Sequence, residues 1–295
     1  MIKKLKINVW VLAIRPRTLP AAVAPVLIGT AMAFMEERIK INIFLLTLAA
    51  AILIQIGTNL ANDYFDYIKG TDNNERKGPI RVMQSGLLTK KVIRISIIGV
   101  FLLASICGVF LIFVGGIPIL IIGVLAILFG ILYTAGPLPL GYIGLGDIFV
   151  LVFFGPVAVG GTFYLQTLNI SLLAIIAGLA PGFLSVAILV TNNLRDLEAD
   201  KKSGKKTLIV RFSYRFGIIE YFFSIIFAFL IPIILTLITR NHFFSLISIL
   251  GIIPAIWLLK RIVSRPEPGA LIKILINTGN SLMIYSILFS IGWIL

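Results

Sequence analysis

The length of its apolar runs is the feature that most constrains how this chain can fold. Between Arg94 and Asp147, for example, the sequence contains no charged residue. Of the 295 residues, 59% are hydrophobic and only 13% are charged, and the mean hydropathy is +1.07. No water-soluble core absorbs that much apolar sequence, so we predict an integral membrane protein.

The apolar runs have the length of helices and lack the short polar/apolar alternation that is typical of barrel strands. We therefore expect an all-α membrane protein with nine transmembrane helices. The expected spans are residues 18–35, 42–62, 92–114, 117–135, 147–165, 171–193, 217–239, 243–260 and 275–295.

Lys and Arg outnumber Asp and Glu by 26 to 12. No groove-binding motif or interleaved aromatic platform accompanies them, which argues against nucleic acid as a partner. In the nine-span arrangement, all of the basic residues except Arg38, Lys40 and Arg240 fall on one side. Because basic residues collect in cytoplasmic loops, we expect a multi-pass protein of the cell (plasma) membrane with its N-terminus in the cytoplasm and its C-terminus outside.

We expect one membrane domain over residues 1–295. The long loops after the second and sixth spans both open with an acidic cluster, and the two clusters lie about half the chain apart. This spacing predicts two related halves, about residues 10–135 and 147–260, followed by a ninth helix at 275–295.

Each of these two segments carries an amide followed by two carboxylates on one helical face. The members lie three, four or seven residues apart, which places them on one side of a helix. The first set is Asn59, Asp63 and Asp66, and the second is Asn193, Asp196 and Asp200, with Asn192 as an alternative amide. A single such cluster is usually a solvated helix end, but two clusters with one plan indicate a site.

Carboxylates at the end of a transmembrane helix need water or cations to compensate their charge. Hard oxygen ligands of this kind suit Mg²⁺, which typically also binds substrate phosphates. The bases around the clusters suit the phosphate oxygens instead. These bases are Lys77, Arg81, Arg195, Lys201, Lys205 and Lys206. The sequence therefore predicts a metal–diphosphate site at the membrane surface.

At this point the motifs resemble those of a known family. The segments NDYFDYIKGTD at 62–72 and NNLRDLEADKKSGKKTL at 192–208 resemble the two aspartate-rich motifs of the UbiA superfamily of intramembrane prenyltransferases. RPRTLPAAVAPVLIG, RVMQSGLLT and YTAGPLPLGYIGLGD resemble the branch that prenylates 1,4-dihydroxy-2-naphthoate for menaquinone biosynthesis. Gly70 stands where many members have a third acid, and Asp72 comes two residues later, as in that branch.

The resemblance implies a UbiA-type bundle around a central cavity that opens laterally to lipid. It implies a Mg²⁺-dependent aromatic prenyltransferase whose partners are a polyprenyl diphosphate, an aromatic acid acceptor and membrane lipid. With 1,4-dihydroxy-2-naphthoate as acceptor, decarboxylation accompanies transfer and gives demethylmenaquinone. The alternatives are another acceptor (4-hydroxybenzoate, homogentisate, a porphyrin or glyceryl phosphate) or a membrane transporter, which would carry its acids in the middle of its helices.

The resemblance also implies roles for individual residues. The expected catalytic residues are Asp63, Asp66, Asp196, Asp200 and Tyr133. The expected metal ligands are Asn59, Asp63, Asp66, Asp72, Asn192, Asp196 and Asp200. The expected diphosphate-binding residues are Asn59, Lys77, Arg81, Asn192, Asn193, Lys201 and Lys205. The expected acceptor-binding residues are Arg15 and Thr134. The alternative readings are a topology anchor for Arg15 and an interfacial belt residue for Tyr133.

Overall fold

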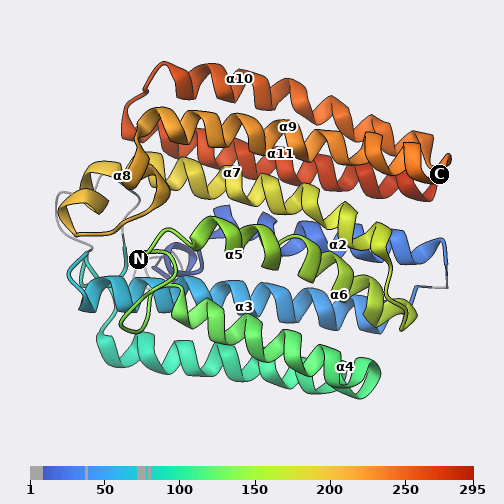
Figure 1. The fold of residues 1–295 in the computed structure, drawn as a ribbon. Helices are drawn as coiled ribbons and strands as arrows, with labels where there is room; N and C mark the ends of the chain where they lie inside the picture. The colour runs from blue at the N-terminus through green and yellow to red at the C-terminus, as the bar shows by residue number, and fades with distance from the viewer. Residues whose placement is uncertain (1–8, 37–38, 72–77, 79–80) are drawn as a thin grey trace, which may run out of the picture.

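A computed structural model describes residues 9–36, 39–71, 78 and 81–295. In this part of the chain the regular elements are all helical (Figure 1). Residues 9–14 form a short helix. The elements after it are η1 (Pro16–Thr18), α2 (Pro20–Phe34), α3 (Ile41–Ile68), α4 (Lys90–Leu132), α5 (Gly146–Phe153), α6 (Pro156–Thr167), α7 (Leu172–Lys202), α8 (Leu208–Phe212), α9 (Tyr214–Thr239), η2 (Phe243–Gly251), α10 (Ile252–Val263) and α11 (Pro268–Ile294).

Within the described residues, seven helical stretches are long and apolar enough to cross a membrane. An eighth is added if Val9–Thr18 and Pro20–Phe34, which meet at a bend of 48°, form one span. Two of the expected spans correspond to pairs of elements that continue each other, α5 with α6 and η2 with α10. The prediction of an all-helical membrane protein is confirmed, whereas this count does not reach nine.

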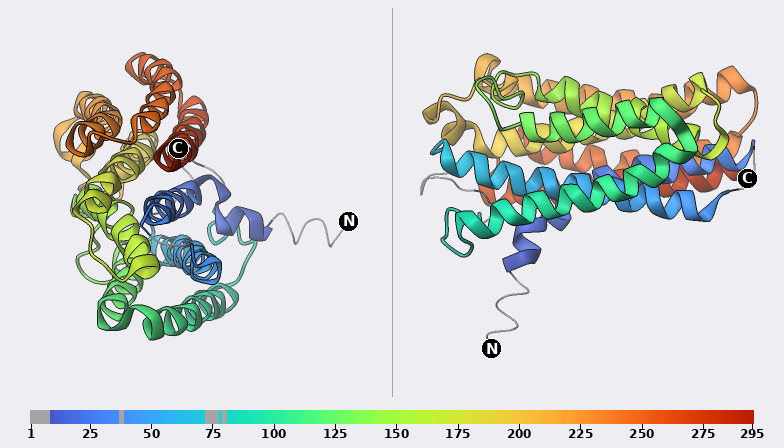
Figure 2. Two further views of the ribbon diagram at one scale, coloured as in Figure 1. Left: turned by 90° about the vertical axis from the view of Figure 1, so that its right-hand side faces the viewer. Right: turned by 90° about the horizontal axis from the view of Figure 1, so that it is seen from below.

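The remaining difference from nine lies in α4. Its 43 residues count as one stretch, whereas the sequence predicts two spans there. At about 1.5 Å per residue a straight helix of this length would extend about 64 Å, roughly twice the hydrocarbon core of a bilayer. Gly116 interrupts α4 with φ 65° and ψ −151°, a conformation that glycine adopts readily. Figures 1 and 2 show the helix doubling back into two arms that run side by side.

The helix α7 lies at the centre of the bundle and is the most buried of the membrane-length helices, whereas α4 lies on the outside and is the least buried. Glycines let the backbone of α7 approach its neighbours. A Cβ atom at Gly178 would lie 2.8 Å from the backbone of Gly155, which connects α5 to α6. Most of the large core also packs around α7, including Leu184, Tyr221 and Phe289.

Helices α3 and α7 both continue beyond the ends that the hydropathy predicts at residues 62 and 193, and they end at Ile68 and Lys202. The acidic clusters therefore lie in the last turns of these helices, as their helical spacing predicts. Both helices end on the side of the bundle where α8 lies, and the C-terminus lies at the opposite end (Figure 1). The fold thus brings the two clusters to one end of the molecule.

Candidate active site

A cavity of about 560 Å³ extends from this polar end into the bundle. Its walls come from α2, α3, both arms of α4, α5, α6 and α7, and they are mostly apolar. Its polar lining is concentrated at the end where α3 and α7 finish. Those lining residues include Arg15, Asn59, Asn62, Asp66, Arg81, Tyr133, Thr134, Tyr142, Asn192, Asn193, Asp196, Asp200 and Lys205.

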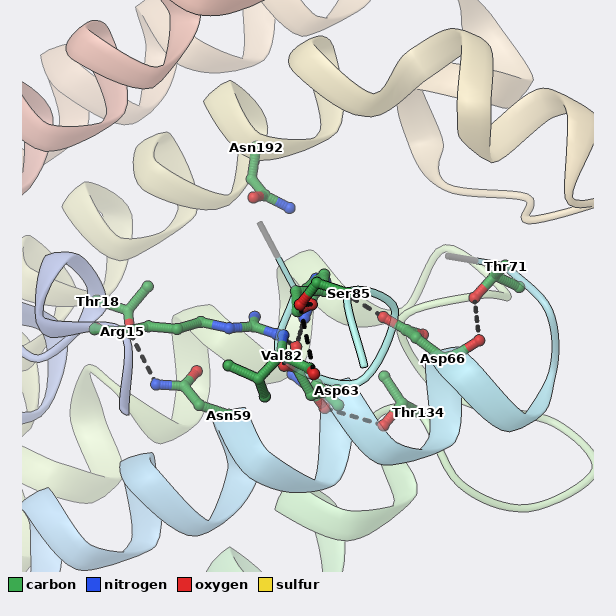
Figure 3. A network of polar contacts seen from close by, with 12 residues as sticks. Arg15, Thr18, Asn59, Asp63, Asp66, Thr71, Val82, Ser85, Thr134 and Asn192 are labelled. Atoms are coloured by element: carbon green, nitrogen blue, oxygen red, sulfur yellow. Dashed lines mark hydrogen bonds and ion pairs between the residues drawn. The ribbon is translucent and has the colours of Figure 1, made fainter. Parts of the chain in front are cut away.

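Asp63 is enclosed by cationic partners (Figure 3). Its Oδ1 accepts hydrogen bonds from the guanidinium groups of both Arg15 and Arg81, and its Oδ2 accepts from the backbone N–H of Val82 at 3.3 Å. Asp63 is only 1% exposed, so these bonds compensate a charge that is almost removed from solvent. Arg15 makes its bond from a left-handed backbone with φ 55°, which is costly for a residue with a Cβ atom.

Asp66 joins three elements. Its Oδ1 accepts a hydrogen bond from the hydroxyl of Tyr142 at 2.5 Å, and its Oδ2 lies 3.4 Å from the guanidinium of Arg81. Its Oδ1 is also 3.6 Å from the ammonium of Lys205, which follows α7. A carboxylate at the end of α3 is thereby connected to the loop before α5 and to the segment after α7.

The second cluster is held by its own arginine. Arg195 donates to both carboxylate oxygens of Asp196, at 2.8 and 2.5 Å, and to Oδ1 of Asn192 at 2.7 Å. Figure 3 shows Asn192 pointing from its helix toward the network around Asp63. One turn further along α7, Asp200 lies 3.5 Å from the ammonium of Lys205.

Asp66 and Asp200 therefore meet across one ammonium group, that of Lys205. The oxygens in this arrangement can be compared with the ligands that Mg²⁺ prefers. Two carboxylates already converge on one cation, and Asp196 and Asn192, whose oxygens Arg195 holds in place, line the same cavity. Within the described residues no set of three or more acids, histidines or cysteines is close enough to bind a metal alone. The donor set fits a Mg²⁺ ion that completes its coordination with substrate phosphate oxygens and water.

The expected residues fall into three groups. Asp66, Arg81, Asn193, Asp196, Asp200 and Lys205 line the cavity together, with Arg15, Asn59, Tyr133, Thr134 and Asn192. Asp63 is not among the described lining residues, because Arg15 and Arg81 cover it. Lys201 is not among them either, since its ammonium lies on the exposed side of α7, 3.3 Å from Glu198. Asp72 and Lys77 lie outside the described residues.

Two of the lining residues have specific partners. The side-chain amide of Asn59 donates to the carbonyl of Ile14 at 2.8 Å and to Thr18 Oγ1 at 3.0 Å, which ties α3 to the segment before α2. The hydroxyl of Thr134 donates to Oδ1 of Asn62 at 2.9 Å. Asn59 thus directs its amide nitrogen toward the chain itself and leaves only its amide oxygen as a ligand of the expected type.

Tyr142 is a site residue that the sequence reasoning did not identify. The ammonium groups of Lys69 and Lys205 lie 4.9 and 4.6 Å from the centre of its ring, and its backbone carbonyl accepts from Lys206 N–H at 2.7 Å. Lys69 also donates to the carbonyl of Thr134 at 2.8 Å, and desolvation lowers its pKa. A tyrosine in a Gly- and Pro-rich loop carries no signal of this role, which depends on three segments distant in sequence.

The fold and the site together define a class of protein: a membrane-embedded helical bundle with an apolar cavity closed at one end by paired acids and bases. The model of the UbiA prenyltransferase family matches residues 22–281. The chain belongs to this family, and it is an integral membrane protein.

Curated relatives and solved structures agree with this assignment. The chain is 44% identical over 211 residues to 1,4-dihydroxy-2-naphthoate octaprenyltransferase of Escherichia coli (strain K12), a match that covers 68% of each chain. It is 29% identical over 281 residues to the protein of that name from Bacillus subtilis (strain 168), which covers 94% of this chain and 89% of the relative.

Two solved structures share the fold. A UbiA homolog from Archaeoglobus fulgidus bound to DMAPP and Mg²⁺ has a TM-score of 0.63 at 15% identity, with 96% of this chain and 99% of that chain covered. A UbiA homolog from Aeropyrum pernix K1 has a TM-score of 0.69 at 12% identity, with 93% and 96% covered.

Proposed function

We propose that the protein transfers a polyprenyl group from a polyprenyl diphosphate to 1,4-dihydroxy-2-naphthoate, with loss of carbon dioxide. The observation that carries this proposal is the meeting of Asp66 and Asp200 across Lys205 at the polar end of an apolar cavity. Such a site has acids for a metal, bases for a diphosphate and an apolar wall for a prenyl chain. The curated relatives that bear the naphthoate octaprenyltransferase name support the choice of acceptor.

The chain's own residues bind and orient the diphosphate. Arg81 and Lys205 line the cavity and present cationic groups, which match phosphate oxygens. When bound, Mg²⁺ would be held by Asp66, Asp196 and Asp200 and would neutralise charge on the leaving diphosphate. The Lys205 ammonium lies beside two of these carboxylates and 4.6 Å from the centre of the Tyr142 ring, and we expect it to contact the diphosphate.

Breaking the carbon–oxygen bond of the donor leaves an allylic cation, which must be kept from water. The apolar walls of the cavity serve this purpose, and Tyr133 lies among the lining residues at the polar end, where its ring can face the cation. An electron-rich ring carbon of the acceptor then attacks the cation, and the carboxylate leaves as carbon dioxide. The long prenyl chain lies along the apolar part of the cavity.

We place the polar edge of the acceptor near Arg15 and Thr134. Both residues line the cavity beside the acids, and Arg15 provides a cation for the carboxylate of the acceptor. Arg15 also pairs with Asp63, so its side chain is already held in place for this contact. A roomy apolar cavity with a few fixed polar groups is the usual form of a site for a bicyclic ligand.

This proposal is tested by offering purified protein, Mg²⁺ and one polyprenyl diphosphate with either 1,4-dihydroxy-2-naphthoate or 4-hydroxybenzoate. We expect kcat/KM to be at least about tenfold higher for the naphthoate, because the ratio reports differential transition-state binding. The product, identified by mass, should lack the carboxyl group. Arg15→Ala should raise KM for the acceptor more than KM for the donor. A preference for the single ring would move the chain to another branch of the family.

We also propose a topology of nine spans, which counts the two arms of α4 separately and takes residues 9–34 as one span. From the distribution of basic residues we propose a plasma membrane protein with its N-terminus in the cytoplasm. In this orientation the polar end of the cavity faces the cytoplasm. The relation between the two halves of the chain stays a prediction.

The topology has its own test. An odd number of spans with a cytoplasmic N-terminus puts Leu295 outside, so an alkaline phosphatase fused after this residue should be active. A fusion in the loop between α10 and α11, at the other end of the bundle, should be inactive and serves as the control. An inactive fusion after Leu295 would contradict the nine spans without affecting the proposed chemistry.

A further inference from the structure

The cavity extends far beyond the polar site. On α3 its lining runs from Asp66 down to Thr47, and at about 1.5 Å per residue this is a depth of about 28 Å. Four backbone bonds of an extended chain advance about 5 Å, so the depth accommodates roughly six isoprene units. An octaprenyl chain is longer, about 40 Å by the same measure. A donor of that length therefore occupies the whole depth, and its last isoprene units lie outside the cavity.

Two glycines of α4 line this cavity, one on each arm. A Cβ atom added at Gly108 or at Gly123 would meet no heavy atom of the described chain within 4 Å, so both positions face open space. Most glycines between packed helices show the opposite, as at Gly57, where the same atom would lie 2.7 Å from the ring of Phe101.

Both glycines lie at one depth. Gly57 of α3 contacts Phe101, and Gly130 approaches Thr58 of α3, which sets the register of the two arms against that helix. Two helical turns from these contacts, Gly108 and Gly123 come level with Ala50 and Ala51, which also line the cavity. This level is about 23 Å from Asp66, or four to five isoprene units.

The lining residues around this level are also exposed to the surroundings of the bundle. Val109, Leu120 and Val124 of α4 line the cavity, yet 49%, 44% and 53% of their surfaces remain accessible. The cavity wall is thin here and faces the outer side of the bundle, where α4 lies (Figure 2).

Resting on the proposed function, we infer that Gly108 and Gly123 determine how long a prenyl donor the protein accepts. Because these two positions have no side chains, the part of the cavity that the distal isoprene units occupy stays open. Because an added Cβ atom meets nothing within 4 Å at either position, a leucine there would extend into that part of the cavity. It would obstruct a long chain but not a chain that ends before this level.

The test compares octaprenyl and geranyl diphosphate with one acceptor in wild type, Gly108→Leu and Gly123→Leu. A geranyl chain has two isoprene units and ends well short of the glycines. We expect the ratio of kcat/KM for octaprenyl over geranyl donor to fall at least about tenfold in both variants, the scale of forcing extra volume into a packed site. An unchanged ratio in both variants would overturn the inference.

Gly99→Leu is the matched control, because Gly99 also lies in α4 and faces open space in the described chain but is not among the lining residues. Its ratio should equal that of wild type. The dissociation constants of the two donors, measured by calorimetry, give the same octaprenyl-to-geranyl comparison without an acceptor. If wild type transfers neither donor, the proposed function fails, while the binding ratio still decides the inference. If a leucine variant does not fold, Gly108→Ala and Gly123→Ala should show a smaller shift in the same direction.

Discussion

The Asp200→Asn and Asp66→Asn variants are expected to turn over at least about 100-fold more slowly than wild type, the scale of losing one preorganised electrostatic group. Both carboxylates approach the ammonium of Lys205 from opposite helices, at 3.5 and 3.6 Å. An amide can still accept a hydrogen bond there but carries no charge to hold a cation. Initial rates of diphosphate release at saturating donor and Mg²⁺ measure the effect.

Glu198→Gln is the matched control for Asp200. It removes a carboxylate from the same helix, but Glu198 is exposed and pairs with Lys201 at the surface. Surface pairs of this kind contribute little, so the rate should stay within about twofold of wild type. Because Asp66 and Asp200 act on one cation, the double variant should be little slower than either single variant. Independent, multiplicative losses would show that the two acids do not share a site.

The Arg81→Met variant is expected to lose about 3 kcal/mol of stability, because breaking a buried ion pair leaves an uncompensated charge. Arg81 contacts both Asp63 and Asp66, and these carboxylates are 1% and 2% exposed. Arg15 still compensates part of the charge of Asp63, which keeps the loss at the lower end of the usual range. Equilibrium unfolding in mixed detergent micelles measures the change.

Adding Asp63→Asn to the Arg81→Met variant shows whether the stability is lost through an unpaired charge or through lost packing. With Arg81→Met in place, removing the charge of Asp63 should restore part of the lost stability, although turnover stays low. Arg94→Met is the control, since Arg94 stacks on the ring of Tyr64 and bonds only to its hydroxyl among the described contacts. A double variant less stable than Arg81→Met alone would contradict the role of Arg81 as the partner of a buried charge.

Much of the fold could be predicted from hydropathy because a membrane leaves few alternatives to apolar helices. Hydropathy could not show where α3 and α7 end. These helices continue into their polar motifs because carboxylates and bases there compensate each other, as Asp196 and Arg195 do. The predicted spans 92–114 and 117–135 part where the two arms of α4 meet at Gly116, but hydropathy could not show the positive φ of this residue, since backbone dihedrals have no hydropathic signal.

For the site, helical spacing was enough to place the acids of each motif on one face. It could not distinguish Asp63 from Asp66, which lie less than one turn apart but have different neighbours. Arg81 contacts both, but Asp63 also pairs with Arg15, whereas Asp66 lies near Lys205. Such a difference depends on contacts across long stretches of sequence. The same is true of Tyr142, whose partners come from α3 and from the segment after α7.

The turn at Gly116 decides whether the chain crosses the bundle an even or an odd number of times before α7. Asp66 and Asp200 meet at one end of the bundle, so the chain must reverse direction an even number of times between α3 and α7 for both helices to finish there. One of those reversals depends on a single residue with a positive φ in the middle of an apolar stretch. Were the two arms to join as one straight helix, every later element would be inverted. The two halves of the site would then lie on opposite faces of the membrane, each with its residues intact.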